Sequence, residues 1–267
     1  MKERMKQPPV VLSIAGSDPS GGAGIQADLK SISALGGYGA AVITAITAQN
    51  TLGVQGVFPL AAEVVRAQLV SVFEDLHPGA VKIGMVHDAQ LVEVIVACLK
   101  RYEPDHVVYD PVMISTSGRR LMTEESIAYI EQQLFPRCSL ITPNLDEASL
   151  LVGHRLETAE EMAEAGGVLA RRYGCSVLVK GGHLQGERMC DLLCDGVENR
   201  LYEAAKSHSS NLHGTGCTLS SAIATYLAHG ASLPDAIAQA KGYITRAIEA
   251  AAEWHIGQGN GPLWQFV

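Results

Sequence analysis

The sequence predicts an α/β fold in which a mostly parallel sheet is covered by helices on both faces. Short apolar runs rich in β-branched residues, such as VVLSIA at 10–15 and SVLVK at 176–180, are typical of buried strands. Segments with the apolar spacing of helices lie between these runs, and strands that alternate with helices pair in parallel. The chain has 267 residues, 47% of them hydrophobic, and shows no internal repeat or linker. We therefore expect a single domain over residues 1–267.

Capping and turn residues bound several of the expected elements. Asp88 stands at the N-cap position of one helix, Thr123 begins another with only a partial capping box, and Gly196 marks a hairpin turn. Strands are expected at 10–15, 40–48, 80–86, 106–113, 140–142 and 176–180, with a hairpin of 191–195 and 200–205. Helices are expected at 25–35, 61–76, 88–102, 123–134, 158–173, 217–229 and 233–254. Because ligands of parallel sheets collect at the carboxyl ends of the strands, polar residues that follow the strands are the candidates for a site.

The composition argues against several classes of protein. A formal net charge of −8 argues against nucleic acid or an anionic membrane as the main partner, and leaves room for a small anionic substrate in a local cradle. No apolar run approaches the roughly 18 residues of a membrane span, and 10–15 is too short for the core of a signal peptide. The six cysteines form no CxxC pair, which argues against zinc and fits reduced thiols. We expect a cytoplasmic protein.

The sequence HGTGCTLSS at 213–221 has the pattern of an anion-binding corner. Gly214 and Gly216 flank Thr215, so the backbone can turn sharply and point its N–H groups into one space. The apolar stripe that follows predicts a helix, whose N-terminus favours anions. Cys217 falls in the first turn, where the same field is expected to favour thiolate over thiol. An anion cradle beside a proton acceptor suits phosphoryl transfer to a hydroxyl, although a tight turn with an inert cysteine explains the corner equally well.

The sequence GAGIQA at 22–27 matches the GxGxxA turn of dinucleotide-binding proteins. Two features argue against that function: Gly22 lies well beyond the first strand, and the second strand ends at Gln49 and Asn50 instead of an acidic residue. Asp28, beside this loop, is a candidate for substrate binding, although such a residue is more often solvated. Gln49 offers a donor and an acceptor to the edge of a heteroaromatic ring, and an ordinary loop amide is the alternative.

Three further strand ends carry polar residues. Asp110 can orient Mg²⁺ or phosphate oxygens, or form a structural turn. Asn144 and Glu147 are three residues apart across a helix start, so their oxygens can face one side and suit a water-rich Mg²⁺, while capping also explains Asn144. Lys180 can reach a phosphate or extend to solvent, and His183 is a candidate base or an ordinary polar loop residue.

Together these segments resemble the hydroxymethylpyrimidine/phosphomethylpyrimidine kinases of thiamine biosynthesis, which have the ribokinase-like fold. The matching motifs are IAGSDPSGGAGIQADLK (14–30), VITAITAQN (42–50), VKIGM (81–85), YDPVM (109–113), ITPNLDEA (141–148), VLVKGGH (177–183) and HGTGC (213–217). They span nearly the whole chain in family order. The resemblance implies a three-layer α/β/α sandwich, a homodimer, and ATP and Mg²⁺ as cofactors. It also implies phosphorylation of 4-amino-5-hydroxymethyl-2-methylpyrimidine to its monophosphate and then to the pyrophosphate.

The resemblance implies roles for individual residues as well. The pyrimidine would meet Gln49, Gly16, Asp28, Thr47, Met85 and Val112. Gly214, Thr215 and Gly216 would form the anion hole, with Cys217 as the base. Asn144, Lys180, Gly182 and Thr215 would bind the nucleotide, and Asp110 and Glu147 would serve Mg²⁺. The tail GQGNGP at 257–262 is close to the family's closing Gly-rich motif but lacks a His soon after it, which leaves its role open.

Two other functions fit the same residues. One is a pyridoxal or pyridoxine kinase on the same fold; the related sugar kinases and many pyridoxal kinases carry Asp where this chain has Cys217, so the cysteine favours the pyrimidine branch. Some Cys-bearing relatives nevertheless accept pyridoxal. The other is a non-catalytic protein that binds a vitamin precursor. The presence of Asp110, Asn144, Glu147 and Lys180 beside Cys217 argues against a site that has lost catalysis.

Overall fold

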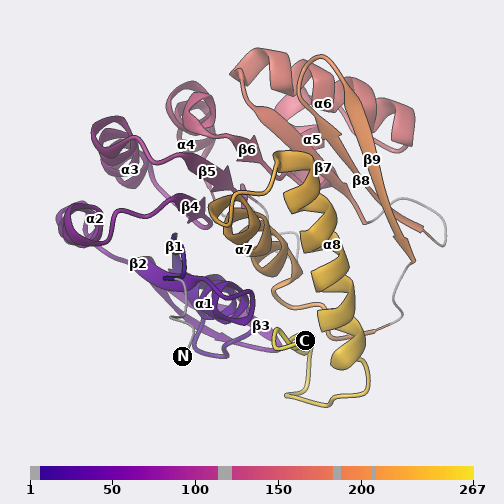
Figure 1. The fold of residues 1–267 in the computed structure, drawn as a ribbon, viewed down its shortest axis with the longest axis horizontal. Helices are drawn as coiled ribbons and strands as arrows, with labels where there is room; N and C mark the ends of the chain where they lie inside the picture. Colours follow the sequence, from indigo (N-terminus) through magenta and orange to yellow (C-terminus); the bar gives the residue numbers. More distant parts are fainter. Residues whose placement is uncertain (1–6, 114–121, 183–187, 206–208) are drawn as a thin grey trace, which may run out of the picture.

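Figure 1 shows the computed structural model of the chain, which describes residues 7–113, 122–182, 188–205 and 209–267. Within these ranges one nine-stranded sheet runs in the order β3-β2-β1-β4-β5-β6-β7-β8-β9. Its strands are β1 (Val10–Ser17), β2 (Tyr38–Asn50), β3 (Gly53–Pro59), β4 (Ala80–Ile83), β5 (His106–Tyr109), β6 (Leu140–Ile141), β7 (Ser176–Gly181), β8 (Arg188–Cys194) and β9 (Asn199–Ala205). From β2 to β7 neighbouring strands are parallel, whereas β3, β8 and β9 are antiparallel. The predicted, mostly parallel sheet is confirmed.

Helices cover both faces of this sheet, as predicted. One face carries α1 (Gly24–Ala34), α7 (Thr215–Ala228) and α8 (Leu233–Ala250), which pack with residues such as Val11 and Val108 in one apolar core. The other face carries α2 (Ala62–Leu76), α3 (Ala89–Tyr102), α4 (Glu124–Tyr129), α5 (Leu145–Val152) and α6 (Ala159–Tyr173), which share a second core with Leu12 and Tyr109. The two layers are visible on either side of the strands in Figure 1. This is the three-layer α/β/α sandwich.

Side-chain caps begin several helices where the sequence indicates them. Asp88 accepts a hydrogen bond from the backbone N–H of Leu91 (2.8 Å) at the start of α3. Thr123 accepts one from Ser126 at the start of α4. Each cap satisfies an N–H group that has no partner within its helix. Among the helices of the described part of the chain, none is both long and apolar enough for a membrane span.

The sequence predictions miss some boundaries and one strand. β3 is an edge strand with the sequence GVQGVFP, whose glycines, proline and mixed exposure hide the strand pattern. Its pairing with β2 extends that strand to Asn50, two residues beyond the predicted end. β4 and β5 end earlier than predicted, and the 123–134 helix changes to a π-helical turn at Ile130. α8 ends at Ala250, four residues earlier than predicted.

Candidate active site

The Gly-rich corner at 213–217 begins helix α7, as the sequence predicts. Gly214 is the N-cap and has φ 89°, a left-handed conformation that favours glycine. A Cβ on Gly214 would collide with the carbonyl oxygen of Gly22, so this corner packs directly on the 18–24 loop. Thr215 is the first helical residue, and Gly216 and Cys217 follow in the first turn. The Thr215 N–H donates to the Leu212 carbonyl oxygen (3.3 Å), and the other N–H groups of the first turn have no partner within the helix, which makes the corner suitable for an anion.

Cys217 is a half-buried free thiol, and its acidity differs from the prediction. Burial raises the pKa of Cys217 to about 11, while the positive charge of Lys82 and a hydrogen bond from the Gly24 backbone only partly oppose that effect. The expectation of a thiolate favoured by the helix terminus is therefore wrong. Desolvation of a charged sulfur outweighs the field of the first turn. With a pKa raised to about 11, the thiol form of Cys217 prevails at neutral pH.

A buried ion pair lies one helical turn below Cys217. Asp28 of α1 accepts hydrogen bonds from Lys82 Nζ (2.9 and 2.8 Å), from Ser13 Oγ (2.6 Å) and from Ser221 Oγ (2.8 Å). Ser221 follows Cys217 by four residues on α7, so both lie on the same side of that helix. The side chains of Asp28 and Lys82 are both 0% exposed. Asp28, expected to touch the substrate, thus lies beneath the site, where its carboxylate is engaged by three neighbours.

Lys82 is a functional candidate that the sequence analysis did not identify. Burial by itself lowers the pKa of Lys82, but the negative charges around it, Asp28 foremost, outweigh that effect and raise it above its ordinary value. The same ammonium acts on Cys217 and Asp110, so it supplies positive charge to the centre of the site. The sequence does contain a signal for this role, since Lys82 interrupts the apolar strand AVKI. A lysine is almost never fully buried without a charged partner, so its position predicts a buried acidic residue beside it.

Asp110 and Lys180 form a second ion pair against the corner. Lys180 Nζ lies 2.6 Å from Asp110 Oδ1, which also accepts a hydrogen bond from Thr142 Oγ1 (3.1 Å). A Cβ on Gly216 would lie 3.0 Å from Asp110 Oδ2 and 3.5 Å from Lys180 Nζ. Burial alone would raise the pKa of Asp110, but Lys180 and Lys82 hold it below its ordinary value. The carboxylate and the ammonium are therefore both charged where the helix N-terminus begins.

Asn144 and Glu147 meet as predicted, but their contacts are those of a capping box. Asn144 Oδ1 accepts from the Glu147 backbone N–H, and Glu147 Oε2 accepts from the Asn144 backbone N–H, both at 2.9 Å. Glu147 Oε1 accepts from the Met113 backbone N–H (3.3 Å), so both carboxylate oxygens are bonded to backbone. Burial raises the pKa of Glu147 to about 7. Asn144 also bridges to Lys180, which places the box beside the Asp110–Lys180 pair.

The donor set around Asp110 fits a magnesium ion that is held mainly by a nucleotide. Within the described residues, no group of three or more His, Cys, Asp or Glu side chains is placed to hold a metal ion alone. Mg²⁺ in kinases keeps several waters and takes one or two carboxylates together with the phosphates. Asp110 can supply one such carboxylate. Each oxygen of Glu147 already accepts one backbone hydrogen bond, which leaves each a second lone pair for a water or an ion.

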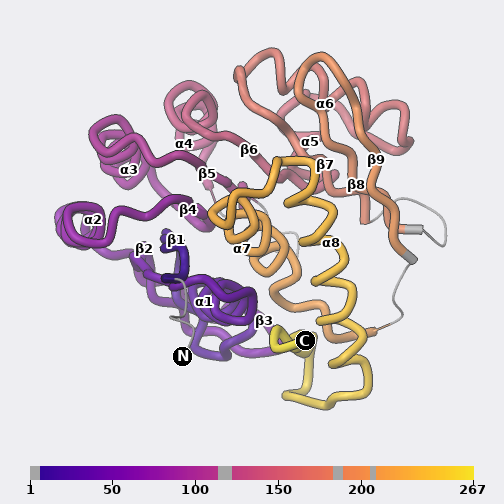
Figure 2. The backbone as a smooth tube through the Cα atoms, viewed as in Figure 1, coloured from indigo at the N-terminus to yellow at the C-terminus, as the bar shows by residue number. Residues whose placement is uncertain are grey.

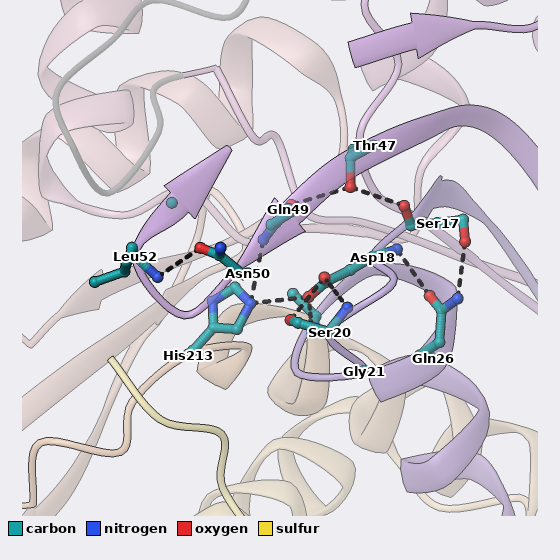
Figure 3. Close-up of polar contacts among 12 residues, drawn as sticks. Ser17, Asp18, Ser20, Gly21, Gln26, Thr47, Gln49, Asn50, Leu52 and His213 are labelled. Atoms are coloured by element: carbon teal, nitrogen blue, oxygen red, sulfur yellow. Dashed lines mark hydrogen bonds and ion pairs between the residues drawn. The ribbon is translucent and has the colours of Figure 1, made fainter. Parts of the chain in front are cut away.

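A polar group around Gln49 contacts His213, the first residue of the corner (Figure 3). Thr47 Oγ1 lies 2.9 Å from the carbonyl oxygen of Ser17 and 3.3 Å from the Gln49 amide. His213, the first residue of the corner, lies 3.2 Å from the Gln49 amide and 2.9 Å from Asp18. The 213–217 corner therefore contacts Gln49 at one end and the Lys180–Asp110 pair at the other. One segment thus lies between Gln49, expected to meet the pyrimidine, and Lys180, expected to bind the nucleotide.

The remaining predicted residues have less extensive contacts. Gly16 lies at the end of β1 next to Met85, because a Cβ there would come within 2.7 Å of Met85 Cε. Met85 and Val112 are half-buried beyond β4 and β5. Gly182 directly follows β7. His183 lies outside the described residues.

The yellow end of the trace in Figure 2, which includes the Gly-rich tail at 257–262, returns toward β3. Thr51 Oγ1, in the turn between β2 and β3, accepts hydrogen bonds from the backbone N–H groups of Gln258 (3.1 Å) and Gly259 (3.2 Å). The carbonyl oxygen of Gly261 accepts from the His213 backbone N–H (3.1 Å). The tail, whose role the sequence left open, thus links the β2–β3 turn to the start of the anion corner.

Comparison with known proteins gives a consistent result. A family model described as phosphomethylpyrimidine kinase matches residues 18–264. A hydroxymethylpyrimidine/phosphomethylpyrimidine kinase of Rhizobium meliloti is 49% identical over 258 residues, which cover 96% of this chain and 97% of that protein. The crystal structure of a phosphomethylpyrimidine kinase from Clostridium difficile is 45% identical with a TM-score of 0.80, over 90% of this chain and 99% of the other. An ADP complex of Bacillus subtilis pyridoxal kinase is 35% identical with a TM-score of 0.90, over 97% and 98% of the two chains.

Proposed function

The chain belongs to the phosphomethylpyrimidine kinase family, and we propose that residues 1–267 form one kinase domain whose site is centred on the 213–217 corner. Its reaction is the ATP-dependent phosphorylation of 4-amino-5-hydroxymethyl-2-methylpyrimidine to the monophosphate and then to the pyrophosphate, in thiamine biosynthesis. The observation that carries the residue assignment is the position of the corner between Gln49 and the Lys180–Asp110 pair. A ring held at Gln49 and phosphates held at Lys180 would meet at the first turn of α7.

The nucleotide phosphates belong on the Lys180 side of the corner. Lys180 supplies a charged ammonium, and the backbone N–H groups of Gly214, Thr215 and Gly216 supply the anion hole for the phosphoryl group in transfer. Asn144 and Gly182 lie at the neighbouring strand ends and complete the nucleotide side. Mg²⁺, held by Asp110, Glu147, water and the phosphates themselves, would neutralise charge on the phosphate oxygens.

The substrate ring belongs on the Gln49 side. The Gln49 amide can pair with the amino group and ring nitrogen of an aminopyrimidine, and Thr47, Gly16, Met85 and Val112 would surround the ring. Asp28 does not touch the ring in this arrangement. Its carboxylate holds the Lys82 ammonium in place near Cys217. In this arrangement the hydroxymethyl group faces Cys217.

The two transfers make different demands on Cys217. In the first, the alcohol must lose its proton, and the thiolate form of Cys217, which the positive charge of Lys82 stabilises, accepts that proton and becomes a thiol. In the second, the nucleophile is a phosphate oxygen, which is already ionised at neutral pH. The same anion hole serves both steps, but only the first needs a base.

A pyridoxal kinase is the second candidate. The Bacillus subtilis pyridoxal kinase is similar over nearly the whole chain, and a ring with a hydroxymethyl group resembles the pyrimidine alcohol in size. Cys217 favours a pyrimidine kinase over a pyridoxal kinase. Release of ADP, measured side by side with the pyrimidine alcohol, its monophosphate and pyridoxal, tests the assignment: the first two should support turnover well above pyridoxal. Binding of the pyrimidine without ADP release would instead indicate a non-catalytic binding protein.

A homodimer in the cytoplasm is the setting we propose. The edge strand β3 and its neighbour β2 carry an exposed apolar pair, Ile46 (41% exposed) opposite Phe58 (61% exposed), with Val54 and Val57 nearby. An edge strand with exposed apolar side chains is suited to pair with a second copy. All six cysteines are free thiols, which fits a reducing compartment. A Phe58→Glu variant that remains a dimer by light scattering would rule out this interface.

A further inference from the structure

His213 lies between two polar side chains on the substrate side of the corner. Its Nε2 atom is 2.9 Å from Asp18 Oδ2 and 3.2 Å from Gln49 Nε2 (Figure 3). The ring also packs against Gly22, where a Cβ would collide with it. One imidazole nitrogen therefore faces both a carboxylate and an amide, and the hydrogen that it carries decides which of these contacts can be a hydrogen bond.

Asp18 determines the state of that nitrogen. Its carboxylate accepts hydrogen bonds from Ser20 N–H (2.9 Å), Ser20 Oγ (2.7 Å) and Ala23 N–H (2.8 Å). Burial alone would raise the pKa of Asp18, but these bonds and the one from His213 lower it to about 2, so the group is ionised at neutral pH. An ionised carboxylate can only accept. Nε2 of His213 therefore carries a hydrogen, whether the ring is neutral or charged, and donates it.

Thr47 fixes the other end of the Gln49 amide by the same reasoning. Thr47 Oγ1 lies 2.9 Å from the Ser17 carbonyl oxygen, which can only accept, so the single hydroxyl hydrogen points there. Toward Gln49, at 3.3 Å, Thr47 Oγ1 is then an acceptor. With Gln49 Nε2 toward His213, two donors face each other and two acceptors face each other. A half-turn of the amide, which exchanges its oxygen and nitrogen, makes the Thr47 contact a hydrogen bond and brings the Gln49 oxygen to the single Nε2 hydrogen of His213, which Asp18 and Gln49 then share as a three-centre bond.

We propose that His213, held by Asp18, is a specificity-determining positioning residue that fixes the Gln49 amide with its carbonyl oxygen toward His213 and its nitrogen toward Thr47. The inference rests on the proposed function, in which Gln49 meets the substrate ring. A fixed amide offers its free lone pair and free N–H in one order only. A 4-aminopyrimidine presents an exocyclic donor beside a ring acceptor, whereas the 4-oxo analogue presents the reverse order. The site therefore selects the amino compound and one orientation of its hydroxymethyl group.

The test compares kcat/KM for the 4-amino alcohol with that for its 4-oxo analogue. In the parent enzyme the amino compound should be favoured by about 100-fold or more, since a wrong ring leaves polar groups of the site unpaired. In His213→Leu the amide is free to turn, and the preference should fall at least about tenfold, mainly through a relative gain with the 4-oxo analogue. His213→Gln, whose amide nitrogen can donate in place of Nε2, should retain most of the preference.

Thr47→Val is the second variant, because it removes the acceptor at the other end of the amide and nearly preserves the side-chain shape. It should lower the preference in the same way if His213→Leu does not fold, as judged by thermal unfolding. An unchanged amino-to-oxo preference in a folded His213→Leu or Thr47→Val enzyme overturns the inference, as does a parent enzyme without preference. Gln49→Ala separates this failure from that of the proposed function: an unchanged KM for the pyrimidine in Gln49→Ala shows that Gln49 does not meet the ring at all.

Discussion

Lys82 and Asp28 form an ion pair in the protein interior, with 2.8 Å between Nζ and Oδ2 and neither side chain exposed to solvent. The pair joins β4 to α1, and Ser221 connects it to α7 one turn below Cys217. A buried charge without its partner is costly, so each member depends on the other. Loss of either member would leave an unpaired charge in the interior, and the pair also places the positive charge of Lys82 near the Cys217 thiol.

Lys82→Met is expected to destabilise the protein strongly, because it leaves the Asp28 carboxylate buried and uncompensated. The free energy of unfolding, measured with urea, should fall by about 3–5 kcal/mol. The double variant Lys82→Met, Asp28→Asn should recover much of that loss. Arg101→Ala, which removes the exposed partner of Glu74, is the control and should cost less than about 1 kcal/mol. A Lys82→Met loss as small as the control's would contradict the role of the pair.

Cys217→Ala is expected to slow the first transfer much more than the second. The alcohol needs a proton acceptor and the monophosphate does not, so only the first step loses general-base catalysis, by about 10²–10⁴-fold. Rates of ADP release from the alcohol and from the monophosphate, measured separately, check this. Equal losses in both reactions would show that Cys217 is not a base.

The first transfer should become faster as the pH rises through the neutral range. Because the pKa of Cys217 is raised to about 11, the thiolate fraction is small at pH 7 and increases about tenfold per pH unit below that value. The rate with the alcohol should follow this increase between about pH 7 and 9, whereas the rate with the monophosphate should vary far less. A flat profile for the alcohol would indicate a thiolate already formed at pH 7.

Lys180→Met is expected to impair phosphoryl transfer with either acceptor. Loss of the ammonium leaves Asp110 without its 2.6 Å partner and removes positive charge from the phosphates. We expect kcat to fall by about 10²–10³-fold with the alcohol and the monophosphate alike. Calorimetric binding of the pyrimidine alone should be unchanged, since we propose that Lys180 binds the nucleotide and not the ring. Weakened pyrimidine binding in this variant would argue against two separate halves of the site.

The sequence predicts much of this arrangement but not its buried electrostatics. Strands such as 10–15, and the turn that begins α7, follow from apolar runs and glycines, which are local signals. The sequence does not predict β3, because this segment is a strand only through its pairing with β2. The sequence also does not predict the role of Lys82 or the raised pKa of Cys217. Both depend on burial and on charged neighbours such as Asp28, which is distant in the sequence and is brought into contact only by the fold.

The most direct test follows the phosphorus of ATP by ³¹P NMR during reaction with the pyrimidine alcohol. The account predicts a phosphomonoester signal that rises and then falls as a pyrophosphate monoester appears, with two ADP formed per alcohol consumed. With Cys217→Ala, the added monophosphate should still be converted to the pyrophosphate while the alcohol reacts slowly. Formation of ADP and inorganic phosphate without either ester would contradict a shared reaction centre at the 213–217 corner.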